Sequence, residues 1–310
     1  MDKIIGDSNY DRKHKWKDPK VEGVNPCGEQ SLASGELCCL AETYPSNHCG
    51  GTFVRWNDKT QQYYKKEMTA YEEYEETLKI AYLYTKSVTL LKTHWPITND
   101  IMHENCRIGI SQSGIADAIK KHGRRTILNW CNKGYKYLKA IDKRWSKEWF
   151  HKPRSIKITT VKPSGSVSLL AGVSPGIHYP HSKYYIRRIR VSRHSEIGKL
   201  AIKNGIPGEI DVIDKDRICL EFPIKRDVKE SKFDVSIWDQ VANAIDYQKY
   251  WSDNQVSITI TYKKDEEDQI KKVLEFAEDK IKGLTFLPLN PGSYYEQAPY
   301  ESITKEEYKE

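Results

Sequence analysis

The 310-residue chain lacks the long apolar runs, the leader pattern and the cysteine spacing that mark several classes of protein. No run approaches the roughly 20 apolar residues that a membrane span needs, and the first 18 residues contain no apolar core of a secretory signal. Seven cysteines at irregular spacing, an odd number, do not form a disulfide framework. We therefore expect no membrane association, and the expected compartment is a reducing cytoplasm.

Apolar residues are also scarce, at 38% of the chain, whereas charged residues make up 30%. The 20 tyrosines and 8 tryptophans supply much of the bulk for a packed core. The formal net charge of +7 suits a polyanionic ligand, either nucleotide phosphates or nucleic acid. Because the basic residues are scattered rather than gathered in a tract, the composition favours nucleotides over nucleic acid.

Apolar periodicity predicts helices that alternate with strands over most of the chain. The expected helices are residues 67–91, 114–121, 126–149, 195–204, 236–251 and 265–280. The expected strands are residues 37–44, 106–111, 155–161, 183–191, 217–222, 255–262 and 284–287. This alternation is typical of an α/β architecture, and no internal repeat interrupts it.

Residues 25–30, with the sequence NPCGEQ, are the most informative segment. Pro26 and Gly28 keep it out of helix. In an extended segment Cys27 and Glu29 would point the same way, and on a tight loop both could converge on one small ligand. Taken alone, the pattern fits an ordinary turn with a buried free cysteine better, since free cysteine is among the most buried residue types.

Residues 162–168, with the sequence KPSGSVS, have the composition of a phosphate cradle. Small residues let backbone N–H groups approach phosphate oxygens, hydroxyls donate as well, and a helix starting there would add its dipole. Pro-Ser-Gly is also an ordinary turn, so this motif is weak by itself. The candidate phosphate-binding residues are Pro163, Ser164, Gly165, Ser166 and Val167.

Two further segments could face a ligand. Residues 172–177 are expected to form a second ligand-facing loop. Arg187, Arg188 and Arg190 could offer forked donors to phosphate groups or to cofactor side chains. Alternatively, these arginines line a solvated strand edge.

Five segments, in this order, resemble the catalytic chain of ribonucleotide reductases. They are NPCGEQ at 25–30, CRIGISQSGIAD at 106–117, VKPSGSVSLLAGVSPGIH at 161–178, KYYIRRIRV at 183–191 and SDNQVSITI at 252–260. Residues 297–306 also resemble the end of that catalytic core. The residues of these segments are most similar to those of the adenosylcobalamin-dependent class, especially its monomeric branch that acts on ribonucleoside triphosphates.

The resemblance implies the second half of the ten-stranded α/β barrel of these reductases, with the active-site finger loop near the N-terminus. Residues 1–23 would be a polar arm or linker, residues 24–300 a partial catalytic barrel domain and residues 301–310 a charged C-terminal tail. The chain would then be the C-terminal part of the core, through a split gene or truncation. The N-terminal half of the reductase would be a separate partner chain.

The resemblance also implies roles for the finger-loop residues. Cys27 would form a transient thiyl radical that removes the 3′-hydrogen of the ribose. Glu29 would be the general base for the 3′-hydroxyl, and Asn25 would hold the hydroxyls by hydrogen bonds. Residues 163–167 would bind the substrate phosphates. Adenosylcobalamin would be the cofactor, although no residue is identified as its binding site.

In the family two cysteines on neighbouring strands deliver the reducing equivalents and end as a disulfide. Cys38 would be one of them, and Cys39, facing the other way, would be structural. The second thiol belongs to the first barrel strand, which lies outside this chain, and a thioredoxin-like or other dithiol would re-reduce the pair. The remaining cysteines are expected to be buried thiols: Cys49, Cys106, Cys131 and Cys219.

Other interpretations of the sequence remain open. The chain could be a non-catalytic, nucleotide-binding remnant of such an enzyme, because the second redox cysteine is missing. A basic nucleic-acid-binding module has only the net charge in its favour. A zinc site built from Cys27, Cys38, Cys39, His48 and Cys49 is disfavoured because no Cys-x2–4-Cys pair is present, so no metal is expected.

Overall fold

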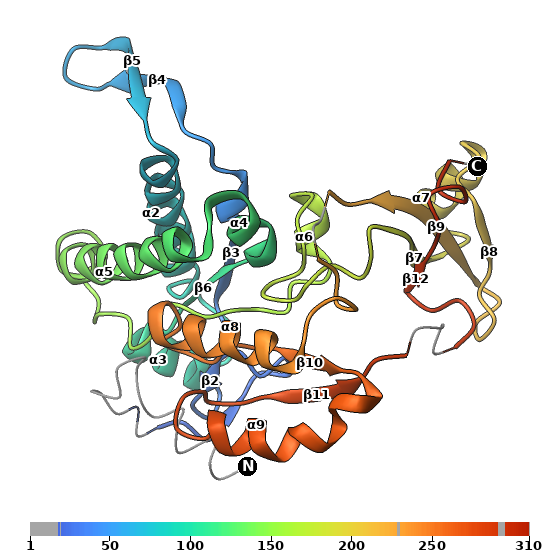
Figure 1. Cartoon of the computed structure of the whole chain (residues 1–310). Coiled ribbons are helices and arrows are strands. Elements are labelled where there is room, and N and C mark those ends of the chain that lie inside the picture. Colours follow the sequence, from blue (N-terminus) through green and yellow to red (C-terminus); the bar gives the residue numbers. More distant parts are fainter. Residues whose placement is uncertain (1–17, 19, 228–229, 291–294, 310) are drawn as a thin grey trace. The chain divides into compact units, whose positions relative to one another are not determined.

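The computed structural model describes residues 18, 20–227, 230–290 and 295–309 (Figure 1), so most of the arm predicted at 1–23 lies outside the described residues. The chain folds as two compact units. The first contains the chain up to His178 together with Ile237–Ile260 and Glu266–Phe286. The second contains Tyr179–Ser236, Thr261–Asp265 and the residues from Leu287 onward.

Most helices of the described residues lie where the apolar periodicity predicts them, and one, at Pro96–Asn105, was not predicted. They are α2 (Ala70–Val88), α3 (Pro96–Asn105), α4 (Ile115–His122), α5 (Arg124–Glu148), α6 (Val167–Leu170), α7 (Glu196–Lys203), α8 (Ile237–Tyr250) and α9 (Ile270–Ala277), with the 3-10 turns η1 (Pro45–Asn47) and η2 (Lys264–Gln269). Helix α2 begins at a capping box in which Thr69 and Glu72 bond each other's backbone N–H groups. Tyr74, Leu78 and Tyr82 recur every four residues on its buried face.

The strands form short pairs in the first unit and one larger sheet in the second. They are β1 (Gly23–Val24), β2 (Ser31–Leu32), β3 (Leu40–Thr43), β4 (Gly51–Asn57), β5 (Gln62–Met68), β6 (Gly109–Gln112), β7 (Tyr184–Ser192), β8 (Gly208–Ile210), β9 (Arg217–Lys225), β10 (Thr259–Tyr262), β11 (Thr285–Pro288) and β12 (Tyr300–Ser302). The second unit holds the antiparallel sheet β12-β7-β9-β8. In the first unit the β4–β5 hairpin extends away from helix α2 (Figure 1).

A parallel array of four segments forms the core of the first unit. β3 pairs in parallel with β6, and the array continues through single parallel bridges from Ile110 to Thr159 and from Val161 to Val256. The bridging residues Ile110, Val161 and Val256 are all buried. Helices α2 to α5 lie in the connections between successive segments, which is the α/β architecture that the alternation predicts.

The strand pairing does not confirm the expected half-barrel. Among the described residues the sheets are one four-stranded sheet, four two-stranded pairs and the two isolated bridges. Residues 155–161, expected to form a strand, contribute only bridge positions, because they pair with their neighbours at one residue on each side. The array is therefore a set of short parallel contacts rather than a continuous curved sheet.

A buried ion pair fastens the segment after the first hairpin to β6. Arg107, immediately before β6, donates from Nε to Glu36 Oε2 at 3.0 Å and also pairs with Asp18. Glu36 Oε2 in turn accepts the backbone N–H of Ala33 at 2.8 Å. All three charged side chains are buried, so removal of one partner would leave an uncompensated charge in the interior.

Candidate functional site

Residues 25–30 form the loop of the β1–β2 hairpin, which confirms the predicted tight, non-helical turn. Asn25 closes the loop, because its N–H donates to the Gln30 carbonyl and its Oδ1 accepts the Gln30 N–H, both at 3.0 Å. The Gly28 N–H donates to the Asn25 carbonyl at 2.8 Å. Gly28 has a φ of +72°, in the left-handed region that glycine enters without a steric cost.

Three contacts hold this loop against the parallel array. The Glu29 carbonyl accepts a hydrogen bond from Thr160 Oγ1 at 2.6 Å and another from the Gln255 N–H at 3.1 Å. The Cys27 carbonyl accepts a hydrogen bond from Ser257 Oγ at 2.6 Å. The backbone of the loop is thus fixed by residues distant in sequence, and its side chains are left for other partners.

The thiol and the carboxylate of the loop lie in different surroundings. Cys27 is exposed, so the interpretation of this segment as a turn around a buried cysteine is wrong. Partial burial, and then the negative charge of Glu29, raise the pKa of Cys27, while Lys162 acts in the opposite direction. Glu29 is only 1% exposed, and its Oε2 has no hydrogen-bond partner among the described residues. A buried carboxylate oxygen without a donor is costly, and it is an acceptor available to a hydroxyl group.

Cys38 and Cys39 face opposite ways, as predicted. Cys38 is exposed and lies close enough to Cys27 to influence its pKa, whereas Cys39 is buried. Burial, and then Cys38, raise the pKa of Cys39 to about 11. Strand β3 begins at Leu40 rather than at residue 37, so the two cysteines precede it.

Three of the four remaining cysteines are buried as expected, and one is not. The buried ones are Cys106, Cys131 and Cys219. Cys49 is exposed, which corrects the expectation. It lies at the corner that leads into β4, where Lys121 Nζ is 3.0 Å from its Sγ, so its neighbour is an ammonium group rather than an apolar core.

The candidate phosphate loop leaves a row of backbone donors unused. Within the part of the chain that the structure describes, the N–H groups of residues 164–167 have no acceptor. A Cβ placed on Gly165 would meet no heavy atom within 4 Å, so the loop is open at its centre. The helix expected after the loop is α6, which has only four residues, so its dipole adds little and the donors themselves must bind an anion.

Lys162 connects the phosphate loop with the rest of the site. Its charge acts on the Cys27 thiol, and its Nζ lies 3.7 Å from Glu42 Oε2. The second predicted ligand loop, residues 172–177, lies against it: Gly176 has a φ of +53°, and a Cβ there would clash with the Lys162 carbonyl oxygen. The finger loop and both predicted ligand loops therefore lie in the same region of the first unit.

Glu42 is the site residue that the sequence analysis missed. It lies on β3 opposite Ser111 of β6, and its carboxylate accepts hydroxyl hydrogens from Ser111, Ser113 and Ser164. Burial raises the pKa of Glu42, and the serine hydroxyls and Lys162 oppose this rise. The sequence signal that could have revealed a buried acceptor nearby is the pair of serines at 111 and 113, at the end of a fully buried strand.

The three arginines of β7 are paired within the second unit. The Arg187 guanidinium lies 4.4 Å from the centre of the Tyr300 ring. Arg188 forms ion pairs with Glu221 at 2.6 Å and with Glu301 at 2.5 Å, and Arg190 forms one with Asp211. Their donors thus serve the sheet of the second unit. This pairing explains their basic, alternating pattern without a phosphate or a cofactor.

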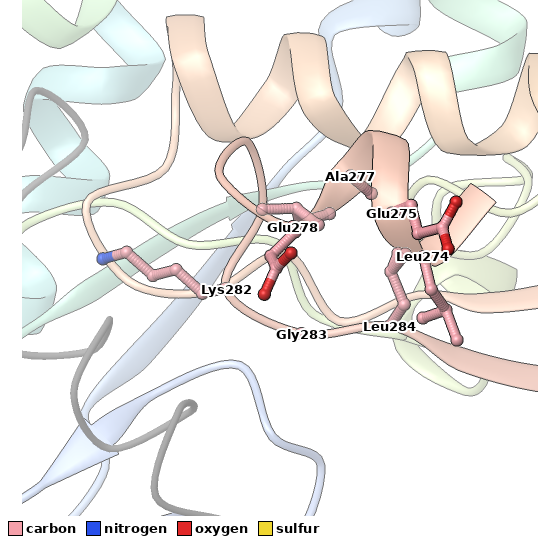
Figure 2. A pocket seen from close by; sticks show the side chains of 8 residues that line it. Leu274, Glu275, Ala277, Glu278, Lys282, Gly283 and Leu284 are labelled. Carbon is pink, nitrogen blue, oxygen red and sulfur yellow. The ribbon is translucent and has the colours of Figure 1, made fainter. Parts of the chain in front are cut away.

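A pocket of about 380 Å³ lies beside α9 and the segment that follows it (Figure 2). Leu274, Leu284 and two carboxylates, Glu275 and Glu278, line it. Lys282 also lines the pocket, but its Nζ donates to the Asp253 carbonyl at 2.6 Å. The other charged side chains of the lining are carboxylates, which do not suit phosphate groups, and none of the predicted site residues lies here.

The described residues offer neither a metal-binding cluster nor a membrane-spanning helix. No group of three or more histidine, cysteine, aspartate or glutamate side chains there is placed to hold a metal ion. In the same residues no helix has both the length and the apolar content needed to cross a membrane.

Comparison with solved structures identifies the class to which this fold and site belong. A B12-dependent (class II) ribonucleotide reductase matches 97% of this chain and 44% of its own, with a TM-score of 0.80 and 33% identity. The alpha subunit of a class Id ribonucleotide reductase from Actinobacillus ureae shares the fold, with a TM-score of 0.58 at 14% identity over 93% of this chain and 57% of its own. The chain belongs to the ribonucleotide reductase family.

Sequence relatives specify the branch. A probable adenosylcobalamin-dependent ribonucleoside-triphosphate reductase from Dictyostelium discoideum is 40% identical over 95% of this chain and 37% of its own length. The adenosylcobalamin-dependent ribonucleoside-triphosphate reductase from Euglena gracilis is 40% identical over 98% of this chain and 39% of its own length. The reductase of that name from Lactobacillus leichmannii is 34% identical over 94% of this chain and 41% of its own length. No protein-family profile matches the chain. The resemblance to the adenosylcobalamin-dependent class is confirmed, and the chain spans about two fifths of the length of these relatives.

Proposed function

We propose that the chain is the C-terminal part of the catalytic core of a ribonucleotide reductase that converts ribonucleoside triphosphates to 2′-deoxyribonucleotides by thiyl-radical chemistry. One observation carries the proposal. The exposed Cys27 thiol, the unpartnered buried Glu29 carboxylate and the free N–H row of residues 164–167 lie in one unit of the fold. The homology to reductases of this class supports it.

Cys27 and Glu29 carry the proposed chemistry on the ribose. An S–H bond is weak enough to give a radical, yet the sulfur radical can still take the 3′-hydrogen from carbon. Glu29 Oε2, which lacks a donor, accepts the proton of the 3′-hydroxyl, and this promotes loss of the 2′-hydroxyl as water. Asn25 uses its Oδ1 to close the loop. This leaves the amide NH2 of Asn25 to bind the sugar hydroxyls.

Cys38 supplies one of the two reducing thiols. It is exposed and electrostatically coupled to Cys27, which suits a group that returns hydrogen to the same substrate. The overall reaction converts one ribonucleotide and two thiols to one deoxyribonucleotide, one disulfide and water. We assign the second thiol to the part of the reductase sequence that the relatives contain and this chain does not cover. A thioredoxin-like or other dithiol then reduces the disulfide.

Adenosylcobalamin, the cofactor in the relatives' names, is proposed as the cofactor here. When bound, it supplies the one-electron oxidation that converts the thiol to the thiyl radical. The exposure of Cys27 fits such a bulky group, because a buried sulfur would be out of its reach. The cofactor would therefore lie on the open side of the finger loop.

The phosphate loop and the parallel array complete the proposed assembly. The free N–H groups of residues 164–167 and the Lys162 ammonium would bind the triphosphate. The parallel array would be one part of the barrel wall, and the remaining strands would come from the rest of the reductase, on the same polypeptide or on a partner. Pairing with those strands would cover the open edges of the array.

The test is reduction of the four ribonucleotides by the chain combined with the remaining barrel strands, with adenosylcobalamin and a dithiol. Cys27→Ser should abolish product, because an O–H bond is too strong to give the radical, and Cys38→Ser should abolish turnover with the dithiol. Cys49→Ser is the matched control, since Cys49 is exposed but lies outside the proposed chemistry, and should retain full activity. Product from a folded Cys27→Ser assembly would overturn the proposal.

The non-catalytic, nucleotide-binding remnant remains the second candidate. One observation favours it: the described cysteines whose pKa Cys38 raises are Cys27, which is proposed to form the radical, and the buried Cys39. Neither of them is the second redox thiol. A complete assembly that binds ribonucleotides but forms no product would identify this second function.

A further inference from the structure

A buried carboxylate lies beneath the candidate phosphate loop and is surrounded by hydroxyl groups. The Glu42 side chain is 4% exposed. Its Oε1 accepts hydrogen bonds from Ser111 Oγ and Ser113 Oγ, both at 2.9 Å, and its Oε2 accepts one from Ser164 Oγ at 2.5 Å. Three serines from two segments of the chain therefore direct their hydrogens at one carboxylate.

Ser111 of β6 and Ser113, which follows the strand, each also accept a backbone hydrogen bond from a different loop. Ser111 Oγ accepts the Lys162 N–H at 2.9 Å, and Ser113 Oγ accepts the Gly176 N–H at 3.0 Å. A hydroxyl has a single hydrogen to donate. Because Glu42 accepts that hydrogen from both serines, the serine oxygens are left to accept from the two loops. One carboxylate thus orients two hydroxyls, and each hydroxyl fixes one loop.

The two loops also touch each other where these bonds arrive. Gly176 packs so closely on the Lys162 carbonyl that no Cβ could be added. Ser164, which begins the row of free N–H groups, has a φ of +53° and donates directly to Glu42. A non-glycine residue in this region of φ is uncommon. The bond to Glu42 is a specific interaction that holds it there.

We propose that Glu42 is a positioning residue that holds residues 162–168 and 172–177 together as one phosphate-binding surface, through separate relays by Ser111 and Ser113. The role in phosphate binding rests on the proposed function, whereas the relay itself does not. Lys162 Nζ, 3.7 Å from Glu42 Oε2, offsets the charge of the carboxylate next to an anion site. The competing explanation is a buried acid that only satisfies its own hydrogen bonds.

Amide hydrogen exchange of the chain separates these explanations. Ser111→Ala should speed exchange at the Lys162 amide alone, and Ser113→Ala at the Gly176 amide alone. Glu42→Leu should speed both, by about tenfold each, because a leucine side chain has no acceptor for the serine hydrogens. The Ile110 amide, bonded to the Ile158 carbonyl at 2.8 Å, is the internal reference and should not change.

A matched variant controls for simple loss of a buried carboxylate. Glu36→Leu removes a buried carboxylate from the ion pair with Arg107 in the same unit. It should lower the melting temperature while leaving exchange at Lys162 and Gly176 unchanged relative to Ile110. If Glu42→Leu leaves both amides unchanged, or if either serine variant loosens both loops equally, the relay is wrong.

Titration calorimetry with inorganic tripolyphosphate then tests the purpose of the relay. Glu42→Leu should weaken binding about tenfold or more, and Glu36→Leu should not. Equal affinity of wild type and Glu42→Leu would show that the loops need no such positioning. If the wild-type chain does not bind tripolyphosphate, the phosphate role in the proposed function fails, and the exchange data still decide the relay.

Discussion

Gly165 allows the proposed phosphate binding to be tested without disturbing the fold. A Cβ at this position meets nothing within 4 Å, and the backbone is not in the left-handed region. Gly165→Val should therefore change the free energy of unfolding by less than about 0.5 kcal/mol, the range of substitutions that touch no special feature. The branched side chain would nevertheless stand over the row of N–H groups at residues 164–167.

The expected loss of affinity follows from the donors that valine would block. A hydrogen bond to a charged acceptor contributes about 1.5–3 kcal/mol. Losing two such bonds at the lower end costs about 3 kcal/mol, which corresponds to roughly a 100-fold weaker complex. Because no group in the loop reads a base, the loss should be similar for ATP, CTP, GTP and UTP.

The measurement is calorimetric titration of each ribonucleotide into wild type and Gly165→Val, with thermal melting of both. Gly283→Val is the matched control, because Gly283 is equally open but follows α9, outside the site. It should bind all four nucleotides as wild type does. A loss confined to one base, or wild-type affinity in a well-folded Gly165→Val protein, would refute the assignment of this loop.

Three other outcomes are expected. A Cβ on residue 109 would clash with Leu40 Cδ2, so Gly109→Ala should lower the free energy of unfolding by about 1–3 kcal/mol in a denaturant titration. An unchanged denaturation midpoint would contradict the close packing of β3 on β6. Iodoacetamide should modify Cys27 only at a higher pH than it modifies a free cysteine, because the pKa of Cys27 is raised. It should not modify the buried Cys39, whose pKa is about 11, until the chain unfolds. Labelling of Cys39 in the folded protein, detected by mass mapping, would contradict its burial. Burial, aided by Lys232, lowers the pKa of His181 to about 4. At His181 the unfolded state then binds more protons between about pH 6.5 and pH 4. This group should therefore lower stability by up to about 1.4 kcal/mol per pH unit on acidification, and His181→Phe should reduce the measured slope by that contribution.

The helices could be predicted where buried side chains recur at a regular spacing along the sequence. Helices α2 and α5 place buried residues at every third or fourth position, and both were predicted within a few residues of their ends. The β4–β5 hairpin was missed because its strands are exposed over most of their length, so its sequence carries no alternation between apolar and polar positions. Helix α3 is short and polar and was missed for the same reason.

The site was predictable where it depends on local turn chemistry. The turn at residues 25–30 and the small residues at 163–167 carry their signals within six residues. Glu42 could not be found this way, because its hydroxyl partners Ser111 and Ser164 are 69 and 122 residues distant. The exposure of Cys49 was also misjudged, since it depends on Lys121, 72 residues away, and not on the preference of its residue type.

The anchoring of the finger loop has a consequence for the order in which the protein is made. Its contacts with Thr160 and Ser257 join residues 131 and 230 positions apart. Closing such long loops is slow and entropically costly, and a ribosome releases the N-terminal part first. Cys27 therefore leaves the ribosome before Thr160 and Ser257 do, and it cannot take its place until the segment around Ser257 has been synthesised and has docked. The Cys27 thiol is thus synthesised well before the residues that position it.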